Sequence, residues 1–391
     1  MDDRAIVDNE EATKGEPSSW MSRLSLTPWI IIRHLLLFVL TYFSVSFAYL
    51  QFAIKVSDAF IFSASFLFFL ATHEFGHYLA AARHSIKASL PWFIPLPIIS
   101  IGTLGAVIQI KDPIQDTRSL FDIGISGPIY GFWVSLILIF IGLLTLPDPS
   151  YVQQFPGHEM LKAYVDSHGH YPDAPLGDTP GETLVLGHTL LFYVISLFSS
   201  NVPPLFELYH YPVLFAGWLG LFFTALNLMP FGQLDGGHIL YALFGQRRQQ
   251  RFSLLLYSII SGLAGVGAVY HLLAVQQDYQ LNFPGLAWTV WATSLFFLFK
   301  FLTRFEWWKL ILYWLSSLCI SGMTWSSLTI PEHASNYGMW LFWLFFIAFL
   351  VRIEHPPVLY QVALSPRQKF WGWVSILIFI LCISPLPFYF V

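Results

Sequence analysis

The sequence predicts an all-α polytopic membrane protein with about nine transmembrane helices and a small membrane-embedded β region near residues 90–110. Of its 391 residues, 56% are hydrophobic and only 11% are charged, whereas soluble domains carry roughly 25% charged residues. Apolar runs of about 20 residues recur along the chain, and each is long enough to span a bilayer. We therefore expect most of the chain to lie within the lipid bilayer. No basic block suggests a nucleic-acid partner.

Nine apolar runs have the length of a membrane-crossing helix. They cover residues 27–49, 57–82, 122–146, 211–245, 252–275, 284–302, 308–327, 337–352 and 370–390. With the N-terminus in the cytosol, only Lys55 and Lys162 of the 19 lysines and arginines would lie outside, as the positive-inside rule demands. The chain starts with acidic residues and does not resemble an organellar transit peptide. We therefore expect a multi-pass protein of the bacterial cytoplasmic (inner) membrane.

Residues 90–110, LPWFIPLPIISIGTLGAVIQI, are apolar but contain three prolines and two glycines. Such a run makes a poor helix, and its β-branched residues favour strands or a hairpin. Non-helical backbone is tolerated at membrane depth only where it is buried in protein or lines a cavity. We therefore expect a polar, water-accessible cavity near the HEFGH segment at residues 73–77.

Two further segments require an interpretation. Residues 184–200, LVLGHTLLFYVISLFSS, are apolar enough to cross, but a crossing would reverse the orientation of everything that follows. We expect an interfacial or re-entrant helix there. The polar segment 147–183 contains His158, His168 and His170; these histidines could bind a metal, but we favour a solvated external loop.

The second apolar run ends in HEFGH, residues 73–77. On a helix, His73 and His77 lie one turn apart on the same face, so both imidazoles can bind one cation. Glu74 lies beside them and is placed to take a proton from metal-bound water. The alternative is a chance match in which each histidine is hydrogen-bonded within a helix bundle. Ionisable groups at bilayer depth are costly, which favours the metal site.

A catalytic zinc ion takes three protein ligands and keeps one position open. The richest source of a third ligand is TALNLMPFGQLDGGHIL, residues 224–240, in which Asp235 follows an apolar run among helix-breaking proline and glycine residues. Asp235 is our expected third ligand. His238 is the alternative third ligand, but we favour a role in which it forms a hydrogen bond beside the site. His73 lies about 24 Å along its helix from the outer end near Ser57, which predicts an active site close to the cytosolic face.

These residues resemble the site-2 proteases, a family of zinc metalloproteases that cleave within the membrane. HEFGH and the pattern N-x-x-P-x-x-x-L-D-G at residues 227–236 match two family motifs in the family's order. SGPIYG at residues 126–131 resembles the Gly-Pro-containing third helix of the family, and IPLPIISIGTLGAVI resembles its membrane-embedded β region. The resemblance covers roughly residues 57–245. It shows neither a PDZ insertion nor a nucleotide-sensing domain.

The resemblance implies a role for each matching residue. His73, His77 and Asp235 would bind one zinc ion, and Glu74 would act as general base and later as proton donor. Asn227 would orient the substrate or stabilise the oxyanion, although it could instead satisfy backbone groups freed by the following proline. The implied partner is a transmembrane protein substrate, cleaved within or near its membrane span. The oligomeric state is not predicted.

The composition, the apolar runs and the resemblance together predict four parts of the chain. Residues 1–26 would be a cytosolic tail and residues 27–56 an extra N-terminal span. Residues 57–250 would form the catalytic transmembrane core, including the external loop 147–183, and residues 251–391 would add accessory helices.

Three other functions remain open from the sequence. The first is a catalytically silent zinc-binding membrane protein, against which the intact Glu74 argues. The second is a transporter, because polar groups at membrane depth also mark ion paths; an inverted repeat would favour it, and none is recognisable. The third is a soluble-type zinc protease tethered to lipid, for which no hydrophilic catalytic domain is recognisable.

Overall fold

The computed structural model describes most of the chain. It covers residues 27–97, 101–176, 183–198, 202–281, 283, 285–303, 306–328 and 331–391. The predicted cytosolic tail 1–26, residues 98–100 of the predicted β region and residues 177–182 of the predicted loop lie outside the described residues.

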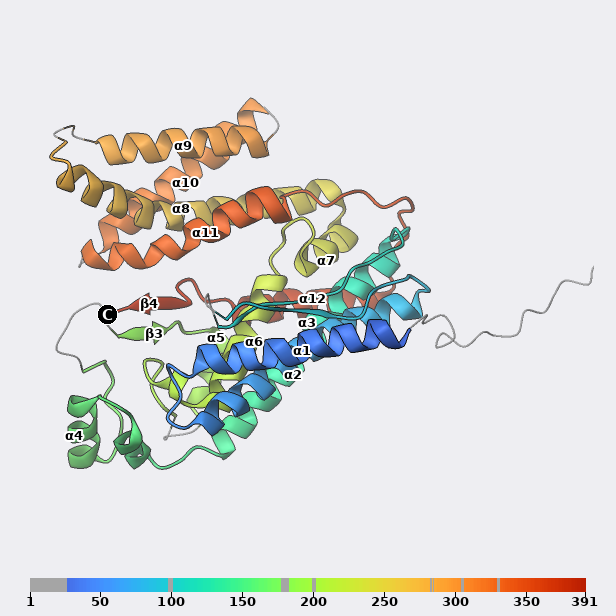
Figure 1. Cartoon of the computed structure of the whole chain (residues 1–391). Coiled ribbons are helices and arrows are strands. Elements are labelled where there is room, and N and C mark those ends of the chain that lie inside the picture. The colour runs from blue at the N-terminus through green and yellow to red at the C-terminus, as the bar shows by residue number, and fades with distance from the viewer. Residues whose placement is uncertain are drawn as a thin grey trace, which may run out of the picture.

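Helices dominate the fold (Figure 1). The described residues also form two short antiparallel sheets and several short 3₁₀ or π-helical segments, which are named η. The elements are α1 (Pro28–Tyr49), α2 (Val56–Arg83), β1 (Trp92–Pro95), β2 (Thr103–Val107), α3 (Thr117–Leu144), η2 (Pro149–Gln154), α4 (Glu159–His168), β3 (Leu184–Leu186), α5 (Leu190–Ser196), η3 (Leu208–His210), α6 (Pro212–Asn227), α7 (Asp235–Phe244), α8 (Gln246–Asp278), α9 (Leu286–Leu302), α10 (Trp307–Ser327), η4 (Pro331–Gly338), α11 (Met339–Phe346), η5 (Ile347–Val351), α12 (Pro366–Cys382) and β4 (Phe388–Phe390).

The polytopic all-α class is confirmed. Five helices of the described chain are long and apolar enough to cross a membrane: α1, α2, α3, α8 and the helical segment His333–Val351. The apolar helices α6 and α9 are shorter, at 16 and 17 residues. The predicted span 211–245 is divided into α6 and α7, because Pro230 and the positive-φ residue Gly232 lie between them.

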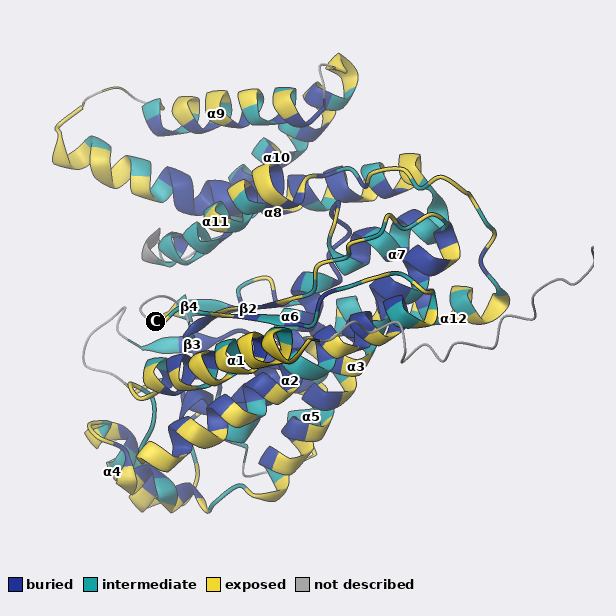
Figure 2. Ribbon diagram, turned by 45° about the vertical axis from the view of Figure 1, so that its right-hand side comes forward, coloured by how far each residue is buried: buried dark blue, intermediate teal, exposed yellow. Residues whose placement is uncertain are grey.

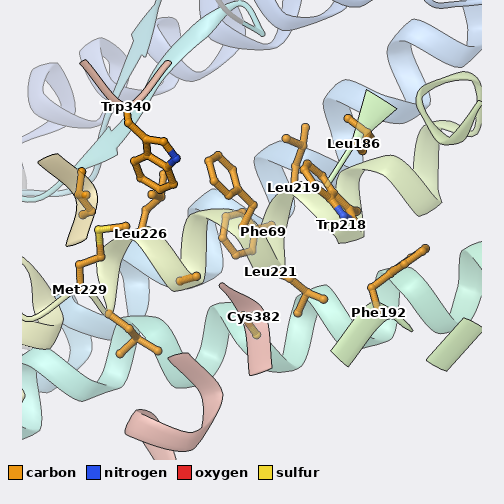
Figure 3. Close-up of a cluster of buried hydrophobic side chains, with 14 of the residues drawn as sticks. Phe69, Leu186, Phe192, Trp218, Leu219, Leu221, Leu226, Met229, Trp340 and Cys382 are labelled. Atoms are coloured by element: carbon orange, nitrogen blue, oxygen red, sulfur yellow. The ribbon is translucent and has the colours of Figure 1, made fainter. Parts of the chain in front are cut away.

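Helices α2, α3 and α6 pack against one another at the centre of the molecule. Aromatic side chains fill the contact between α2 and α6, where the ring centroids of Phe62 and Phe215 lie 5.3 Å apart. Figure 3 shows part of this apolar cluster, including Phe69 of α2 and Trp218 of α6. A Cβ added at Gly217 would lie 2.7 Å from a side-chain carbon of α3. Small residues of this kind let membrane helices approach closely.

The predicted β region is confirmed as an antiparallel hairpin of β1 and β2, in which Trp92 pairs with Val107. Helix α1 packs on this hairpin, and Ser44 donates a hydrogen bond of 2.6 Å to the carbonyl of Gly102. The non-helical backbone is thereby held against protein, as membrane depth requires. The other side of α1 is exposed (Figure 2).

Helix α3 begins at a capped N-terminus. Asp116 accepts hydrogen bonds from the backbone N–H groups of Arg118 (2.9 Å) and Ser119 (3.0 Å). Partial burial raises the pKa of Asp116, but the hydrogen bonds from Ser119 and Arg118 outweigh it and hold the pKa below its usual value. A charged cap at this position fixes the start of the helix that packs on the HEFGH segment.

Two predicted segments differ from the structure. The last span, predicted for 370–390, is shorter because α12 ends at Cys382, and Pro385 and Pro387 cannot continue a helix. The residues that follow form β4, which pairs with β3. The prediction of a helix over 184–200 is therefore wrong for its first residues. The seven-residue α5 that follows is too short to cross a bilayer.

The described residues of the predicted external loop 147–183 include two helical elements, η2 and α4. Helix α4 buries Leu161 and Val165, and η2 buries Val152. These side chains belong to the same apolar cluster as the membrane helices. This segment is therefore packed on the core rather than merely solvated.

Helices α9, α10 and α11 pack on α8 and form a group beside the core (Figure 1). The chain then returns to the core in an extended segment. There, Gly232 donates to the carbonyl of Ile353 (3.3 Å) and Tyr360 donates to the carbonyl of Gln115 (2.8 Å). Helix α12 then packs against α3, α6 and α7. The C-terminal part of the chain thus supports the helix that begins at Asp235.

Candidate metal centre

Helix α2 brings His73, Glu74 and His77 together in its last three turns. All three are buried, with 3%, 8% and 7% of their surface exposed. The imidazoles lie one turn apart, and their Nε2 atoms are separated by 3.1 Å. The structure therefore contains the predicted pair of histidines, His73 and His77, on one face of α2.

The break after α6 places Asp235 opposite this pair. Asp235 is the first residue of α7, where a carboxylate interacts favourably with the helix dipole. A Cβ at Gly236 would overlap the carbonyl of Leu228, and one at Gly237 would overlap the carbonyl of Phe231. The two glycines therefore let the turn fold tightly enough to bring the carboxylate to α2. Its Oδ2 atom lies 3.3 Å from the Nε2 atom of each histidine.

The three converging atoms match the donor set and the spacing of a tetrahedral zinc site. Their separations are 3.1, 3.3 and 3.3 Å, and bonds of 2.0–2.1 Å at tetrahedral angles separate ligand atoms by about 3.3–3.4 Å. His77 donates from Nδ1 to the carbonyl of Ile123 (2.7 Å). Neutral His77 therefore carries its proton on Nδ1 and presents the lone pair of Nε2 to the centre. On this geometry, the residues fit a bound zinc ion.

Helix α3 approaches this centre through the SGPIYG segment. A Cβ at Gly127 would overlap the imidazole of His77, and one at Gly131 would lie 3.1 Å from Nδ1 of His73. One turn earlier, a Cβ at Gly124 would lie 2.7 Å from Cβ of His238. These glycines allow α3 to pack directly against the side chains of His73, His77 and His238.

Two further predicted residues lie beside the centre. The Nδ2 atom of Asn227, the last residue of α6, is 3.4 Å from Nε2 of His73. The carboxylate of Glu74 lies beside the backbone N–H of Ile108, which immediately follows β2. The carbonyl of Pro230 accepts a hydrogen bond of 2.9 Å from the side chain of Gln249 in α8. The Pro230 carbonyl therefore does not need Asn227 as a hydrogen-bond donor.

The structure does not place His238 among the three converging side chains of His73, His77 and Asp235. Its Nδ1 atom lies 2.7 Å from Nε2 of His355, and His355 is 3% exposed. This contact links α7 to the segment that returns from the C-terminal helices. His355 is not among the residues predicted from the sequence, and the only local signal at this position is a histidine that precedes two prolines.

A cavity of about 680 Å³ borders this region between α2, α3 and α12. Its lining includes Gly76 of the HEFGH segment and the polar residues Arg83 and Asp122. Gln368 of α12 donates a hydrogen bond of 2.9 Å to Asp122. A partly polar cavity next to HEFGH is the kind of feature that the sequence predicts.

Comparison with known proteins identifies the family. The model of peptidase family M50 matches residues 61–264, just over half of the 391 residues. A "probable zinc metalloprotease EGY1, chloroplastic" of Oryza sativa subsp. japonica is 33% identical over 195 residues, which cover 50% of this chain and 30% of that protein. The protein of the same name from Arabidopsis thaliana is 30% identical over 198 residues, 51% of this chain and 32% of that protein.

The matched region thus spans about a third of the length of these curated relatives. No solved structure matches the chain. The family match includes both the HEFGH segment and the segment with Asn227 and Asp235. The chain therefore belongs to peptidase family M50, as its resemblance to the site-2 proteases predicts.

Proposed function

We propose that this protein is an intramembrane zinc metalloprotease that hydrolyses peptide bonds within or near transmembrane segments of membrane proteins. The observation that carries the proposal is the convergence of two imidazoles of α2 and a carboxylate of α7, with separations of 3.1–3.3 Å. Family membership and the printed names of the relatives support it.

His73, His77 and Asp235 would hold the zinc ion, which supplies Lewis acidity and makes water a stronger nucleophile near neutral pH. Glu74 takes the proton of the attacking water and later gives it to the leaving amine. Asn227 lies 3.4 Å from a ligand atom, so its amide can donate a hydrogen bond to a peptide carbonyl in the centre. Burial of Glu74 and both histidines excludes bulk water from this chemistry.

A transmembrane helix must unwind locally before hydrolysis, because its peptide groups are engaged in intrahelical hydrogen bonds. Strand β2 is suited to pair with the unwound segment, because among the described residues it belongs to a two-stranded sheet in which β1 is its only neighbour. Leu104 and Val107 of β2 are 63% and 49% exposed. We expect the unwound segment to add to this edge and so satisfy its backbone groups. Because Ile108 lies beside Glu74, a segment held there would be delivered to the general base.

We also propose that the centre is close to the cytosolic face. His73 is followed by ten residues to Arg83 at the end of α2, a distance of about 15 Å. Arg83, Arg118 and Arg367 line the cavity at this end, and cations favour the cytosolic side. The bacterial cytoplasmic membrane stays a prediction, since the relatives named above are described as chloroplastic.

Removal of the metal tests the proposed function. The purified chain, reconstituted in liposomes with a pool of membrane proteins, should generate fragments whose new termini map within or near transmembrane segments. A zinc chelator should abolish these fragments, and added Zn²⁺ should restore them. Zinc bound to the chain without any such fragments would instead identify a catalytically silent binder, and transport without cleavage would identify a transporter.

Replacing Gly127 by alanine should weaken zinc binding at the centre by at least about tenfold, as loss of a supporting contact does at other metal sites. The added methyl group would overlap the His77 imidazole, while alanine itself favours a helix by about 1 kcal/mol over glycine. Competition with a chelating indicator measures the affinity. Gly322→Ala is the matched control, because a Cβ there meets open space. Unchanged affinity in Gly127→Ala would refute the proposed contact.

A further inference from the structure

A second group of metal-binding side chains lies away from the candidate centre. His158 comes from the turn before α4, and Glu207 and His210 come from the turn before α6. The Oε2 atom of Glu207 lies 3.6 Å from Nε2 of His158 and 3.7 Å from Nε2 of His210. Glu207 and His210 are 2% and 5% exposed. A carboxylate and two imidazoles thus face one another, with Glu207 and His210 buried and His158 partly exposed.

The hydrogen bonds of the two histidines direct their Nε2 lone pairs, rather than N–H groups, toward the carboxylate of Glu207. His210 donates from Nδ1 to the carbonyl of Phe52 (2.7 Å), and His158 donates from Nδ1 to the carbonyl of Pro156 (3.1 Å). Each neutral imidazole therefore presents the lone pair of Nε2 to the carboxylate. Within the described chain, Oε2 of Glu207 and Nε2 of His210 have no hydrogen-bond partner. A proton on Glu207 would not bridge the group, because 3.6 Å is too long for a hydrogen bond.

The local backbone and packing hold this arrangement in place. His158 has a φ of 61°, a left-handed conformation that costs energy for a residue with a side chain. Glu207 and His210 are three residues apart across the 3₁₀ turn η3, a spacing that places side chains above one another. The ring of Phe155 packs on His210 with centroids 4.3 Å apart. Buried acceptors without donors are costly, and a cation placed among them removes that cost.

We propose that His158, Glu207 and His210 form a second metal site, which binds a divalent ion of the zinc class and fastens the segment containing α4 to the start of α6. Two imidazoles and one carboxylate are a donor set for Zn²⁺, whereas Ca²⁺ and Mg²⁺ prefer oxygen ligands. The Oε2 atom of Glu207 lies 3.6 and 3.7 Å from the two Nε2 atoms, whereas ligand atoms of a tetrahedral zinc site lie about 3.3–3.4 Å apart. Metal binding would therefore draw the three side chains together. A water molecule would complete the coordination.

The site lies at the opposite end of α6 from the candidate centre. α6 has 16 residues, a length of about 24 Å, with η3 before it and Asn227 at its other end. Figures 1 and 2 both show α4 and α7 on opposite sides of α6. The second ion would therefore be structural and take no part in the chemistry at Glu74.

Zinc binding to the 391-residue chain in detergent tests this proposal without any reference to proteolysis. In a His73→Ala/His77→Ala background, which disables the candidate centre, we expect one Zn²⁺ per chain after dialysis. The thermal unfolding midpoint should be higher with Zn²⁺ than with EDTA, because a ligand that binds only the folded state stabilises it. Adding Glu207→Gln should abolish both effects. His168→Ala is the matched control, since this exposed histidine of α4 lies outside the group, and it should change neither.

A folded background variant that binds no Zn²⁺ would overturn the proposal, and so would undiminished binding after Glu207→Gln. If Glu207→Gln does not fold, His158→Ala replaces it, because the His158 side chain is 27% exposed and tolerates removal more easily. We expect at least a tenfold loss of Zn²⁺ affinity in that variant. Unchanged affinity would again overturn the proposal, whatever the proteolysis assay shows.

Discussion

Replacing Glu74 by glutamine should abolish peptide hydrolysis while leaving zinc binding intact. Glutamine has almost the same shape as glutamate but cannot take a proton from the attacking water. General-base catalysis contributes about 10²–10⁴-fold to a rate, so we expect kcat/KM to fall by about three orders of magnitude, or about 4 kcal/mol of transition-state stabilisation. The measurements are the rate on a susceptible transmembrane substrate in liposomes and the zinc content of the same preparation.

The control for Glu74→Gln is Glu159→Gln, which makes the same chemical change at a carboxylate whose side chain is 82% exposed in α4. It should cleave at the unsubstituted rate. Cleavage by Glu74→Gln at more than about a tenth of that rate, with zinc bound, would show that another group takes the proton. Loss of zinc together with activity would point to a ligand role for Glu74.

Replacing Asp235 by alanine should remove one zinc ion per chain, measured as the difference from the unsubstituted protein. The carboxylate lies 3.3 Å from the Nε2 atom of each histidine, and two imidazoles alone leave the ion without its third ligand. The loss of affinity should exceed the roughly 10–100-fold that follows removal of a group supporting a ligand. Competition with chelators of graded affinity measures it, and hydrolysis should be lost in parallel.

His238→Ala is the comparison that separates the two candidate ligands. His238 lies three residues after Asp235, and its ring contacts His355 at 2.7 Å rather than the histidines of α2. We expect its zinc content to stay at the unsubstituted level at saturating Zn²⁺. The reverse result, with zinc retained in Asp235→Ala and lost in His238→Ala, would refute the assignment.

Features set by local chemistry could be predicted from the sequence. His73 and His77 face the same way because four residues make about one helical turn, and no distant residue is needed to decide this. The hairpin near 90–110 follows similarly from prolines, glycines and β-branched residues that disfavour a helix. In both cases the pattern of a short segment already excludes the alternatives.

Features that join distant segments could not be predicted in this way. The pairing of β3 with β4 joins residues 184–186 to 388–390, and no local pattern in either segment identifies the other. An apolar run is equally suited to an interfacial helix and to a buried strand, so the expected helix at 184–200 is partly wrong. The contact between His238 and His355 likewise depends on the path of the chain after α11.

The sequence by itself determined the helical membrane-protein class, the pairing of His73 and His77 on one face of α2 and the two segments from which a metalloprotease centre would be built, because composition and short spacings fix these properties. The tertiary structure alone decided that Asp235 rather than His238 faces the pair, and that His158 meets Glu207 and His210. The physical reason is that a ligand set from separate segments is defined by distances of 3–4 Å, and only the packing of whole helices determines such distances.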